Sequence, residues 1–324
     1  MMRDINPHPS SRWKDYLVKR ARWFVPLCAI GLVTPIISAG LAGSAGSLVW
    51  MVDLASHWQW LFLAGLVSAC VITFLVDRRW AFALLAVPLP WITASDQVPV
   101  VGPDQISVMK VLTVATANVH LGNRDTSPLI RWIAKDNPDV LVLHEVSPEY
   151  AKRLEALDGY PFRRFTPSTD PFGMAVLSRF PFTQTQVVVG EDGIRHIEAQ
   201  LDWTGQAVKL TTWHPMPPIS PRDHSMRNRQ LRALAEAAKA SGQPAIIAGD
   251  LNATPWSNAF SGLDRIGFRR ATGLAPTWPA AGRGLMGIPI DHVLVTQHWS
   301  VVEGKVGPDI GSDHLPAMVR IRLN

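Results

Sequence analysis

Cysteine is almost missing from this sequence, because only Cys28 and Cys70 occur in 324 residues. Both lie in apolar runs, and residues 108–324 contain no cysteine. A disulfide framework or a cysteine-based metal site is therefore not indicated. A cysteine-free C-terminal part suits an oxidising compartment, although it does not prove one.

A large surplus of either charge is also missing. The chain has 31 Lys and Arg against 26 Asp and Glu, a formal net charge of +5. Residues 108–324 hold 23 of the basic and 20 of the acidic residues, so their surplus is only 3. Such a balance does not mark a nucleic-acid-binding surface. The length suits one large domain or two ordinary ones.

Long runs without charge are present, and they lie near the N-terminus. A basic tail, residues 1–23, precedes an uncharged run at 24–51, and a second run covers 58–76. Each of these two is long enough to cross a bilayer core of ~30 Å. A third run, 80–94, is shorter and contains two prolines, so it is either a tilted span or a re-entrant piece. We predict a membrane anchor over residues 24–95 with about three transmembrane helices.

The distribution of Lys and Arg predicts the orientation of this anchor. The tail holds six basic residues, the loop at 53–57 none, and the second loop two arginines. Because basic segments stay in the cytoplasm, everything after about Ser95 is expected outside it, in a multi-pass protein of the cell membrane. A cleavable signal peptide is disfavoured, because the first run is too long and further runs follow it. Residues 96–107 are predicted to link the anchor to a soluble catalytic domain at 108–324.

Within that domain, the stretch 245–256 combines a short buried-strand pattern with two polar side chains. Asp250 and Asn252 flank Leu251, and side chains two apart on an extended segment point the same way. A carboxylate beside a carboxamide suits water activation and phosphate binding near a hard metal. An Asx-rich turn after an edge strand would use the same residues, so the other segments of the domain are needed to distinguish a catalytic pair from a structural turn.

Polar residues recur where apolar segments end. We predict strands at 108–117, 140–143, 173–177, 197–201, 207–212, 245–248, 290–295 and 315–323, and helices at 128–136, 148–157 and 224–240. The polar residues at these strand ends are Asn118, Glu145, His214, Asp250, Asn252, Asp291, Asp313 and His314. Eight of them together are expected for a cleft built on a sheet. The order of elements is consistent with two sheets packed face to face and covered by helices.

These residues resemble the motifs of a known family. The segments are Asn118, His-Glu at 144–145, Gly-Asp-Leu-Asn at 249–252, Ile-Asp-His at 290–292 and Gly-Ser-Asp-His at 311–314. In order and approximate spacing they are similar to the endonuclease/exonuclease/phosphatase superfamily. The resemblance covers roughly 108–324 and implies an α+β fold, a four-layer α/β/β/α sandwich of two mixed sheets, here preceded by the helical anchor. With that anchor, the chain resembles bacterial membrane-bound members such as the teicoplanin-resistance (polyprenyl pyrophosphate phosphatase-like) group.

The resemblance implies metal-assisted hydrolysis of a phosphate ester or anhydride. Glu145 would be the main ligand of Mg²⁺ (or Mn²⁺), with Asn118 and Asp313 completing an oxygen-rich shell. A salt-bridged strand end is the alternative for Glu145. His144 replaces the glutamine that usually precedes this glutamate, and its own role stays open.

Five further residues are implied as catalytic. His314, oriented by Asp291, would act as a general base or hold the scissile phosphate. Asp250 would orient or deprotonate the attacking water, and Asn252 would donate to a phosphoryl oxygen. His214 would stabilise the charge that builds on phosphorus and could protonate the leaving oxygen.

Other basic side chains are open to two interpretations. Arg222, Arg227 and Arg229 form either a solvated basic face or the cations that a pyrophosphate needs, and Arg222 and Arg229 are our candidates for substrate binding. The loop at 277–279 and Arg283 are expected to shape substrate choice. Four histidines are predicted to be structural or superficial: His120, His224, His292 and His298.

Together these observations predict a membrane-anchored, extracytoplasmic, metal-dependent phosphohydrolase. A site close to the membrane favours a lipid-linked phosphate such as a polyprenyl pyrophosphate. A nuclease with the same catalytic residues is the first alternative, which the charge balance does not favour, and a non-catalytic membrane-bound binding protein is the second. No obligate protein partner is inferred.

Overall fold

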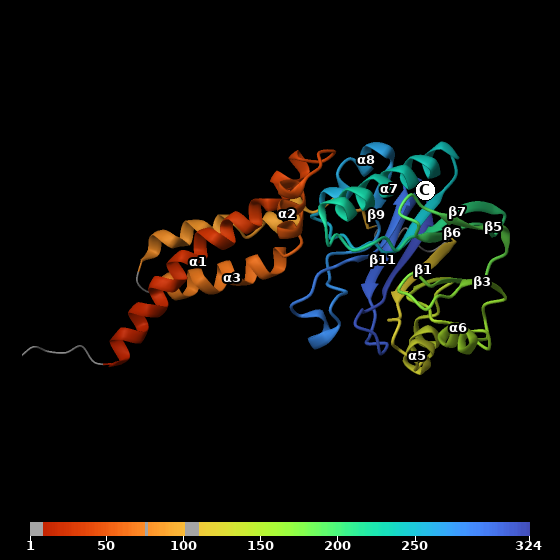
Figure 1. Cartoon of the computed structure of the whole chain (residues 1–324), viewed down its shortest axis with the longest axis horizontal. Helices are drawn as coiled ribbons and strands as arrows, with labels where there is room; N and C mark the ends of the chain where they lie inside the picture. Colours follow the sequence, from red (N-terminus) through yellow and green to blue (C-terminus); the bar gives the residue numbers. More distant parts are fainter. Residues whose placement is uncertain (1–8, 75–76, 101–109) are drawn as a thin grey trace, which may run out of the picture.

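The computed structural model describes residues 9–74, 77–100 and 110–324. An elongated bundle of N-terminal helices is attached by one end to a layered α/β domain (Figure 1). The predictions for residues 1–8 and for the linker residues 101–107 lie outside the described residues.

Two six-stranded mixed sheets form the centre of the domain. The strand order in the first sheet is β11 (Trp299–Val306), β12 (Ala317–Leu323), β1 (Val111–Asn118), β2 (Val140–His144), β4 (Met174–Ser178) and β3 (Phe162–Thr166). The order in the second sheet is β5 (Phe182–Val189), β6 (Arg195–Trp203), β7 (Gln206–Thr212), β8 (Ala245–Asp250), β10 (Asp291–Thr296) and β9 (Phe268–Arg270). The pairs β1–β2 and β7–β8 are parallel, and the other neighbouring strands described here are antiparallel.

The alternation of side chains along β1 shows how the layers are built. Leu112 and Val114 point into the core between the two sheets, whereas Ala115 and Ala117 belong to the core on the outer face of the first sheet. Successive strand residues face opposite sides, so a strand buried on both faces is apolar throughout. Full burial of a valine or leucine side chain contributes up to ~1.5–3 kcal/mol to the stability of the fold, and this burial stabilises the packing of the two sheets on each other.

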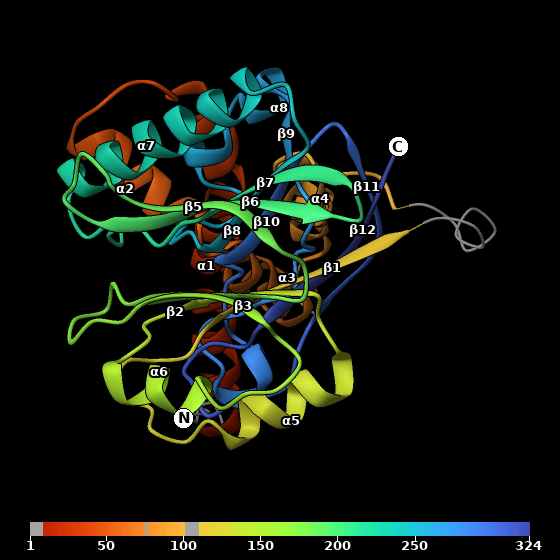
Figure 2. The same ribbon diagram turned by 90° about the vertical axis from the view of Figure 1, so that its right-hand side faces the viewer.

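Helices cover the outer face of each sheet (Figure 2). The first sheet is covered by α5 (Ser127–Asp136) and α6 (Pro148–Leu154), and the second by α7 (Pro221–Ala240) and α8 (Leu263–Ile266). Two short 3-10 helices, η3 (Asn258–Phe260) and η4 (Ala281–Gly284), lie in loops. The order helix, sheet, sheet, helix confirms the predicted four-layer sandwich.

The N-terminal bundle contains α1 (Pro9–Gly40), α2 (Ser47–Ser56), α3 (Gln59–Phe74), η1 (Arg78–Ala86) and α4 (Leu89–Thr93). From the far end of the bundle α1 runs to the domain, α3 runs back, and η1 returns towards the domain (Figure 1). The helix α1 starts inside the predicted tail and ends at Gly40. A segment with Gly43 and Gly46 at positive φ then separates it from α2.

The helix lengths correct the prediction of about three transmembrane helices. Among the described residues, one helix is long and apolar enough to cross a membrane, the Tyr16–Gly40 part of α1. The helices α2 and α3 pass the same test only as a pair bent by 63°. The third apolar run forms the nine-residue η1, ~18 Å long at the rise of a 3-10 helix, and the five-residue α4. Pro88 and Pro90 separate and start these pieces, so no single spanning helix forms there.

The bundle is fixed to the domain by a buried ion pair. Asp53, predicted to lie in a loop, is fully buried in α2, and its Oδ2 lies 3.1 Å from Nη2 of Arg227 in α7. Asp53 also accepts hydrogen bonds from the main-chain N–H of Asn258, at 2.7 Å, and from the Ser257 hydroxyl, at 2.8 Å. Each carboxylate oxygen is thus satisfied, as burial of a charge requires.

Three tryptophans extend this contact. The ring of Trp60 in α3 makes edge contacts with Trp91 of α4 and with Trp256 of the domain, at centroid distances of 5.2 and 5.3 Å. The start of the predicted linker is also ordered, because Val98 donates its N–H to the Arg270 carbonyl, at 2.8 Å. Residues 96–100 therefore run along the domain as an extension of the sheets.

The ion pair makes a testable contribution to stability. We expect Asp53→Ala to lower the free energy of unfolding by about 3–5 kcal/mol, because it leaves Arg227 buried without its carboxylate. Thermal unfolding in detergent measures the effect. Glu303→Ala is the matched control, since it removes the acid of an exposed pair with Arg320 and should cost less than about 1 kcal/mol. Equal stability of the two variants would contradict the assignment.

Candidate active site

The candidate site lies where the ends of strands from both sheets meet. Asn118 ends β1 of the first sheet, and Asp250 ends β8 of the second. Asp291 starts β10 and is paired in register with Asp250, because β10 runs antiparallel to β8. The packing of the two sheets therefore brings side chains that are far apart in sequence to one edge.

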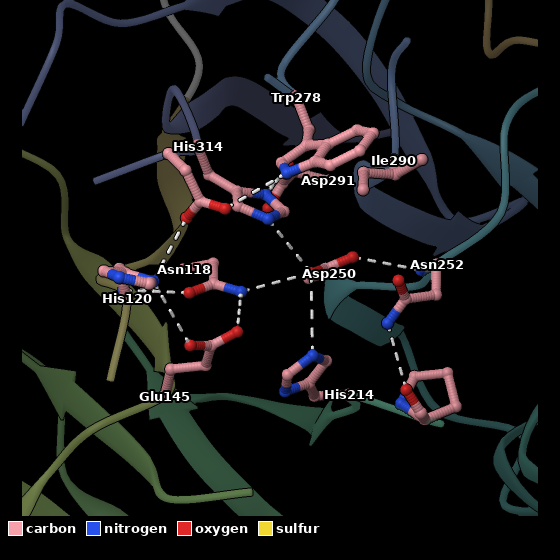
Figure 3. Close-up of polar contacts among 12 residues, drawn as sticks. Asn118, His120, Glu145, His214, Asp250, Asn252, Trp278, Ile290, Asp291 and His314 are labelled. Atoms are coloured by element: carbon pink, nitrogen blue, oxygen red, sulfur yellow. Dashed lines mark hydrogen bonds and ion pairs between the residues drawn. The ribbon is translucent and has the colours of Figure 1, made fainter. Parts of the chain in front are cut away.

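Asp250 is the centre of this arrangement (Figure 3). Its Oδ2 accepts a hydrogen bond from Nδ2 of Asn118 at 3.2 Å and lies 3.6 Å from Nε2 of both His214 and His314. Its Oδ1 accepts the main-chain N–H of Asn252 at 3.0 Å. Asp250 is 2% exposed, so these two hydrogen bonds and the two nearby imidazoles replace the water that its carboxylate would otherwise bind.

His314 and Asp291 form the predicted pair. Nδ1 of His314 lies 2.9 Å from Oδ2 of Asp291, which leaves Nε2 facing Asp250. The hydroxyl of Thr277 accepts the main-chain N–H of Asp291, at 3.2 Å, and so fixes the start of β10. Burial acts to lower the pKa of His314, but the carboxylates of Asp291 and Asp250 outweigh it and raise this pKa to about 10.

A second group of polar contacts surrounds the carboxylate of Glu145. Oε1 accepts Nδ2 of Asn118 at 2.8 Å, and Oε2 accepts the main-chain N–H of Leu121 at 2.9 Å. Nδ1 of His120 lies 3.8 Å from Glu145 and 3.4 Å from Asp313. Glu145 itself has φ of +58°, which turns its side chain from the strand direction into the site.

One cavity of about 640 Å³ joins these residues. Its polar lining consists of His57, Glu145, His214, Asp250, Asn252, Asp313 and His314. Its apolar lining consists of Leu54, Trp58, Pro171, Phe172, Met216, Pro217, Pro218, Trp278, Ile288 and Ile290. None of these described lining residues is an arginine or a lysine. The lining of the cavity thus combines acidic and imidazole side chains with a larger number of apolar side chains.

The side chains at the site are suitable ligands for a divalent cation. Asp250, Asp291 and His314 are buried, and each offers a ligand atom within 4.8 Å of the others, so that they could hold a metal ion. Oδ1 of Asp291 is buried without a hydrogen-bond partner among the described residues. Carboxylates gathered at this density need positive charge nearby, and their oxygen atoms suit a hard cation.

The structure therefore brings together all eight polar residues that the strand ends predicted. The guanidinium-bearing candidates are not part of this group. Arg222 is exposed on the first turn of α7, and Arg229 is exposed beside a different cavity under β5 and β6. Arg227 is buried against Asp53 and is structural. A solvated or structural role explains all three, because none lines the active-site cavity.

Among the histidines set aside on sequence grounds, three are structural and one is not. His224 lies 3.2 Å from Asp53, His292 contacts Thr272, and His298 contacts Thr296, all through ring nitrogens. His120 instead joins the site between Glu145 and Asp313. Its φ of +63° directs the side chain back towards Glu145, and only its position two residues after Asn118 gives a signal in the sequence.

His144 packs beneath the catalytic residues, next to the ring of His214. It is fully buried on β2, and its ring lies 5.4 Å from the ring of His214. Burial, followed by the nearby His214 and His314, lowers the pKa of His144 well below its ordinary value, so the ring stays neutral. Gly249 is required beside it, since a Cβ there would lie 2.6 Å from the His144 ring and 2.0 Å from the Trp213 carbonyl oxygen.

The fold and the site define a class, the hydrolases that cleave phosphoester bonds with a divalent metal. A sequence model of the Endonuclease/Exonuclease/phosphatase family matches residues 115–314, and the chain belongs to that family. No curated protein matched the chain.

Solved structures agree with this assignment. An endonuclease/exonuclease/phosphatase from Beutenbergia cavernae DSM 12333 is 25% identical, with a TM-score of 0.56, over 66% of this chain and 72% of that one. A family protein from Bacteroides thetaiotaomicron is 19% identical, with a TM-score of 0.56, over 66% and 96%. TDP2 from D. rerio, complexed with a single-strand DNA product, is 18% identical, with a TM-score of 0.55, over 66% and 99%. The latter two share the fold.

The raised pKa of His314 predicts how stability depends on pH. In the folded, metal-free protein this pKa is about 10, above the ordinary 6.5, so protonation of His314 favours folding. That contribution is complete below pH ~6.5 and is lost as the pH rises towards 10. In chelator, the melting temperature of wild type should therefore exceed that of His314→Ala by more at pH 6 than at pH 10. His298→Ala controls for the loss of an imidazole outside the cavity, and a pH-independent difference for His314→Ala would refute the prediction.

Proposed function

We propose that this chain is a membrane-anchored phosphohydrolase that cleaves a lipid-linked phosphate ester or anhydride outside the cytoplasm. The observation that carries the proposal is the active-site cavity, which joins the catalytic residues of the family to an apolar wall formed in part by the N-terminal helices. Mg²⁺ or Mn²⁺ is the proposed cofactor.

Two sets of residues are candidates for binding the metal ion. Glu145 and Asp313 offer carboxylate oxygens on the open side of the site, next to Asn118, whose Nδ2 donates to Glu145, while His314 and Asp291 are already hydrogen-bonded to each other. We therefore assign the metal to the Glu145 side, with Asp250 between the two sets. When bound, the cation would polarise the phosphoryl oxygens and neutralise charge.

The remaining residues would support in-line hydrolysis, in which a water oxygen forms a bond to phosphorus and the bond from phosphorus to the leaving oxygen breaks. Asp250 would orient the water and take its proton. Asn252 already donates one Nδ2 hydrogen to the Pro215 carbonyl, at 3.0 Å, and has a second for a phosphoryl oxygen. His214 and His314 face Asp250 through Nε2, so either imidazolium could stabilise the phosphoryl charge, and His214 would protonate the leaving oxygen.

The surface of the bundle supports a membrane anchor. Of 28 exposed large apolar side chains in the described part of the chain, 23 lie before residue 95. Such a concentration exceeds what a water-exposed surface normally carries. A bilayer around the bundle would place the start of α1 and the catalytic domain on opposite sides (Figure 1). Arg22 and Asp77 interact near the far end, where Arg78 and Arg79 also lie, in agreement with a cytoplasmic location of that end.

A nuclease is the second candidate function, because D. rerio TDP2 in its complex with a single-strand DNA product shares the fold. The cavity does not favour it. A nucleic acid needs Lys and Arg along many backbone phosphates, and no described lining residue is either, whereas the proposed Mg²⁺ would supply positive charge for a single diphosphate. The apolar lining instead suits an aliphatic leaving group.

Glu145→Gln tests the metal assignment. The variant keeps the shape of the side chain but removes its charge, so Mg²⁺-dependent turnover should fall by about 10²-fold or more, given that even indirect metal partners cost 10–100-fold. Purified protein is assayed against a lipid pyrophosphate, a sugar phosphate and single-stranded DNA. Glu149→Gln, on the exposed side of α6, is the control and should keep full activity. Undiminished turnover of Glu145→Gln would remove this residue from the site, and a preference for DNA would favour the nuclease.

A reporter fusion tests the orientation. Alkaline phosphatase, which is active only outside the cytoplasm, should be active when it is fused after Asn324. The same reporter fused after Asp77, between α3 and η1, should be inactive. Activity in the second fusion alone would reverse the proposed topology.

A further inference from the structure

The N-terminal helices form part of the active-site cavity. Leu54, His57 and Trp58 line the same cavity as the catalytic residues, although they lie outside the family domain. They belong to the junction of α2 and α3, which is bent by 63°. We call residues 53–59 the α2–α3 corner.

The α2–α3 corner is held in place against the catalytic loop. Arg227, which pairs with Asp53, also donates to the main-chain carbonyl of Asn252. Gln59 at the other end of the corner donates to the Gly31 carbonyl of α1, at 3.0 Å. A group on the corner therefore keeps a fixed position relative to the loop that carries Asn252.

His57 lines this cavity and has one ring nitrogen without a hydrogen-bond partner among the described residues. Its side chain is 95% buried, and Nδ1 lies 2.9 Å from the hydroxyl of Thr254, two residues after Asn252. Its Nε2 is buried and has no hydrogen-bond partner among the described residues. A polar atom buried in this way is costly, so a substrate atom is the natural partner.

The contact with Thr254 couples the two ring nitrogens, because the tautomer decides which of them donates. A hydroxyl that donates to Nδ1 leaves the proton of a neutral imidazole on Nε2. Nε2–H would then donate to an oxygen atom in the cavity. The proposed substrate would supply a phosphate oxygen as this acceptor.

Apolar side chains flank His57. Leu54 precedes it by one helical turn, and Trp58 follows it directly. Phe172 and Met216 of the catalytic domain line the same cavity. The apolar part of the lining is therefore shared between the bundle and the domain.

We propose that His57 donates through Nε2 to a phosphate oxygen beyond the scissile bond, and that Leu54 and Trp58 hold an apolar chain on the leaving group. The substrate class is a diphosphate that carries a long aliphatic chain, and the N-terminal helices complete its binding site. This inference rests on the proposed hydrolase function and specifies its substrate.

Two substrates with the same anhydride bond but different chains distinguish binding of the diphosphate from binding of the aliphatic chain. Full-length protein in detergent is assayed with Mg²⁺ against farnesyl diphosphate, which has a 15-carbon chain, and against methyl diphosphate. Wild type should prefer the long-chain substrate in kcat/KM. Leu54→Ala and Trp58→Ala should reduce kcat/KM about tenfold for the long-chain substrate, mainly through KM, and leave the methyl substrate unaffected. Leu48→Ala in α2 and Trp91→Ala in α4, which lie outside the cavity lining, are the matched controls.

A reciprocal pair of variants tests His57. The amide of His57→Asn can replace Nδ1 and keep the Thr254 contact, whereas the amide of His57→Gln can replace Nε2. If Nε2 binds substrate, His57→Asn should lose about tenfold in kcat/KM for both substrates, and His57→Gln should lose less. If the ring serves only to hold Thr254, the order is reversed, and the proposal for His57 is overturned. Thermal unfolding checks that both variants fold.

The outcomes distinguish this inference from the proposed function. Equal effects of Trp58→Ala on the two substrates, with an active wild type, overturn the inference and leave the hydrolase intact. A wild type that hydrolyses neither diphosphate with Mg²⁺, while it cleaves DNA or a sugar phosphate, overturns the proposed lipid-linked substrate and the inference with it.

Discussion

The arrangement of the site depends on one contact between the two sheets, the hydrogen bond from Asn118 to Asp250. These residues end strands of different sheets, and a carboxylate that is 2% exposed needs several donors at once. The core between the sheets supplies this precision, because close packing leaves the strand ends little freedom to shift. A substitution deep in that core could therefore impair catalysis without touching the site, since a displaced Asp250 loses His214 and His314 together.

The sequence predicted the parts of the fold whose signal is local. Fully buried strands such as β2 and β8 are short apolar runs, and their polar ends marked the site. Strands β3 and β5 lie at sheet edges and carry polar residues at half-buried and exposed positions alike, so no long apolar or alternating pattern identifies them. His120 was missed for a similar reason. Its role depends on a turn with positive φ, which residue type alone does not reveal.

The relation between the helices and the domain could not be predicted either. A charged residue between two apolar runs indicates a loop, and Asp53 was interpreted in this way. Its partner Arg227 is 174 residues away in the sequence, so only the folded chain shows the buried ion pair. Trp60 and Trp91 likewise pack against each other at the contact with the domain, which no local signal in the sequence indicates.

This contact changes what the N-terminal helices do. A tether that only holds an enzyme at a surface needs no fixed geometry, yet here the α2–α3 corner is bonded to the loop that carries Asn252. The carboxylates of Glu145, Asp250 and Asp313 line the cavity, and the corner adds the apolar side chains of Leu54 and Trp58 to the same lining. The carboxylates are compatible with a cation and a phosphate, and the apolar side chains with an aliphatic chain. This mixed lining suits the amphipathic substrate proposed above, and the helices proposed to enter the bilayer supply part of it.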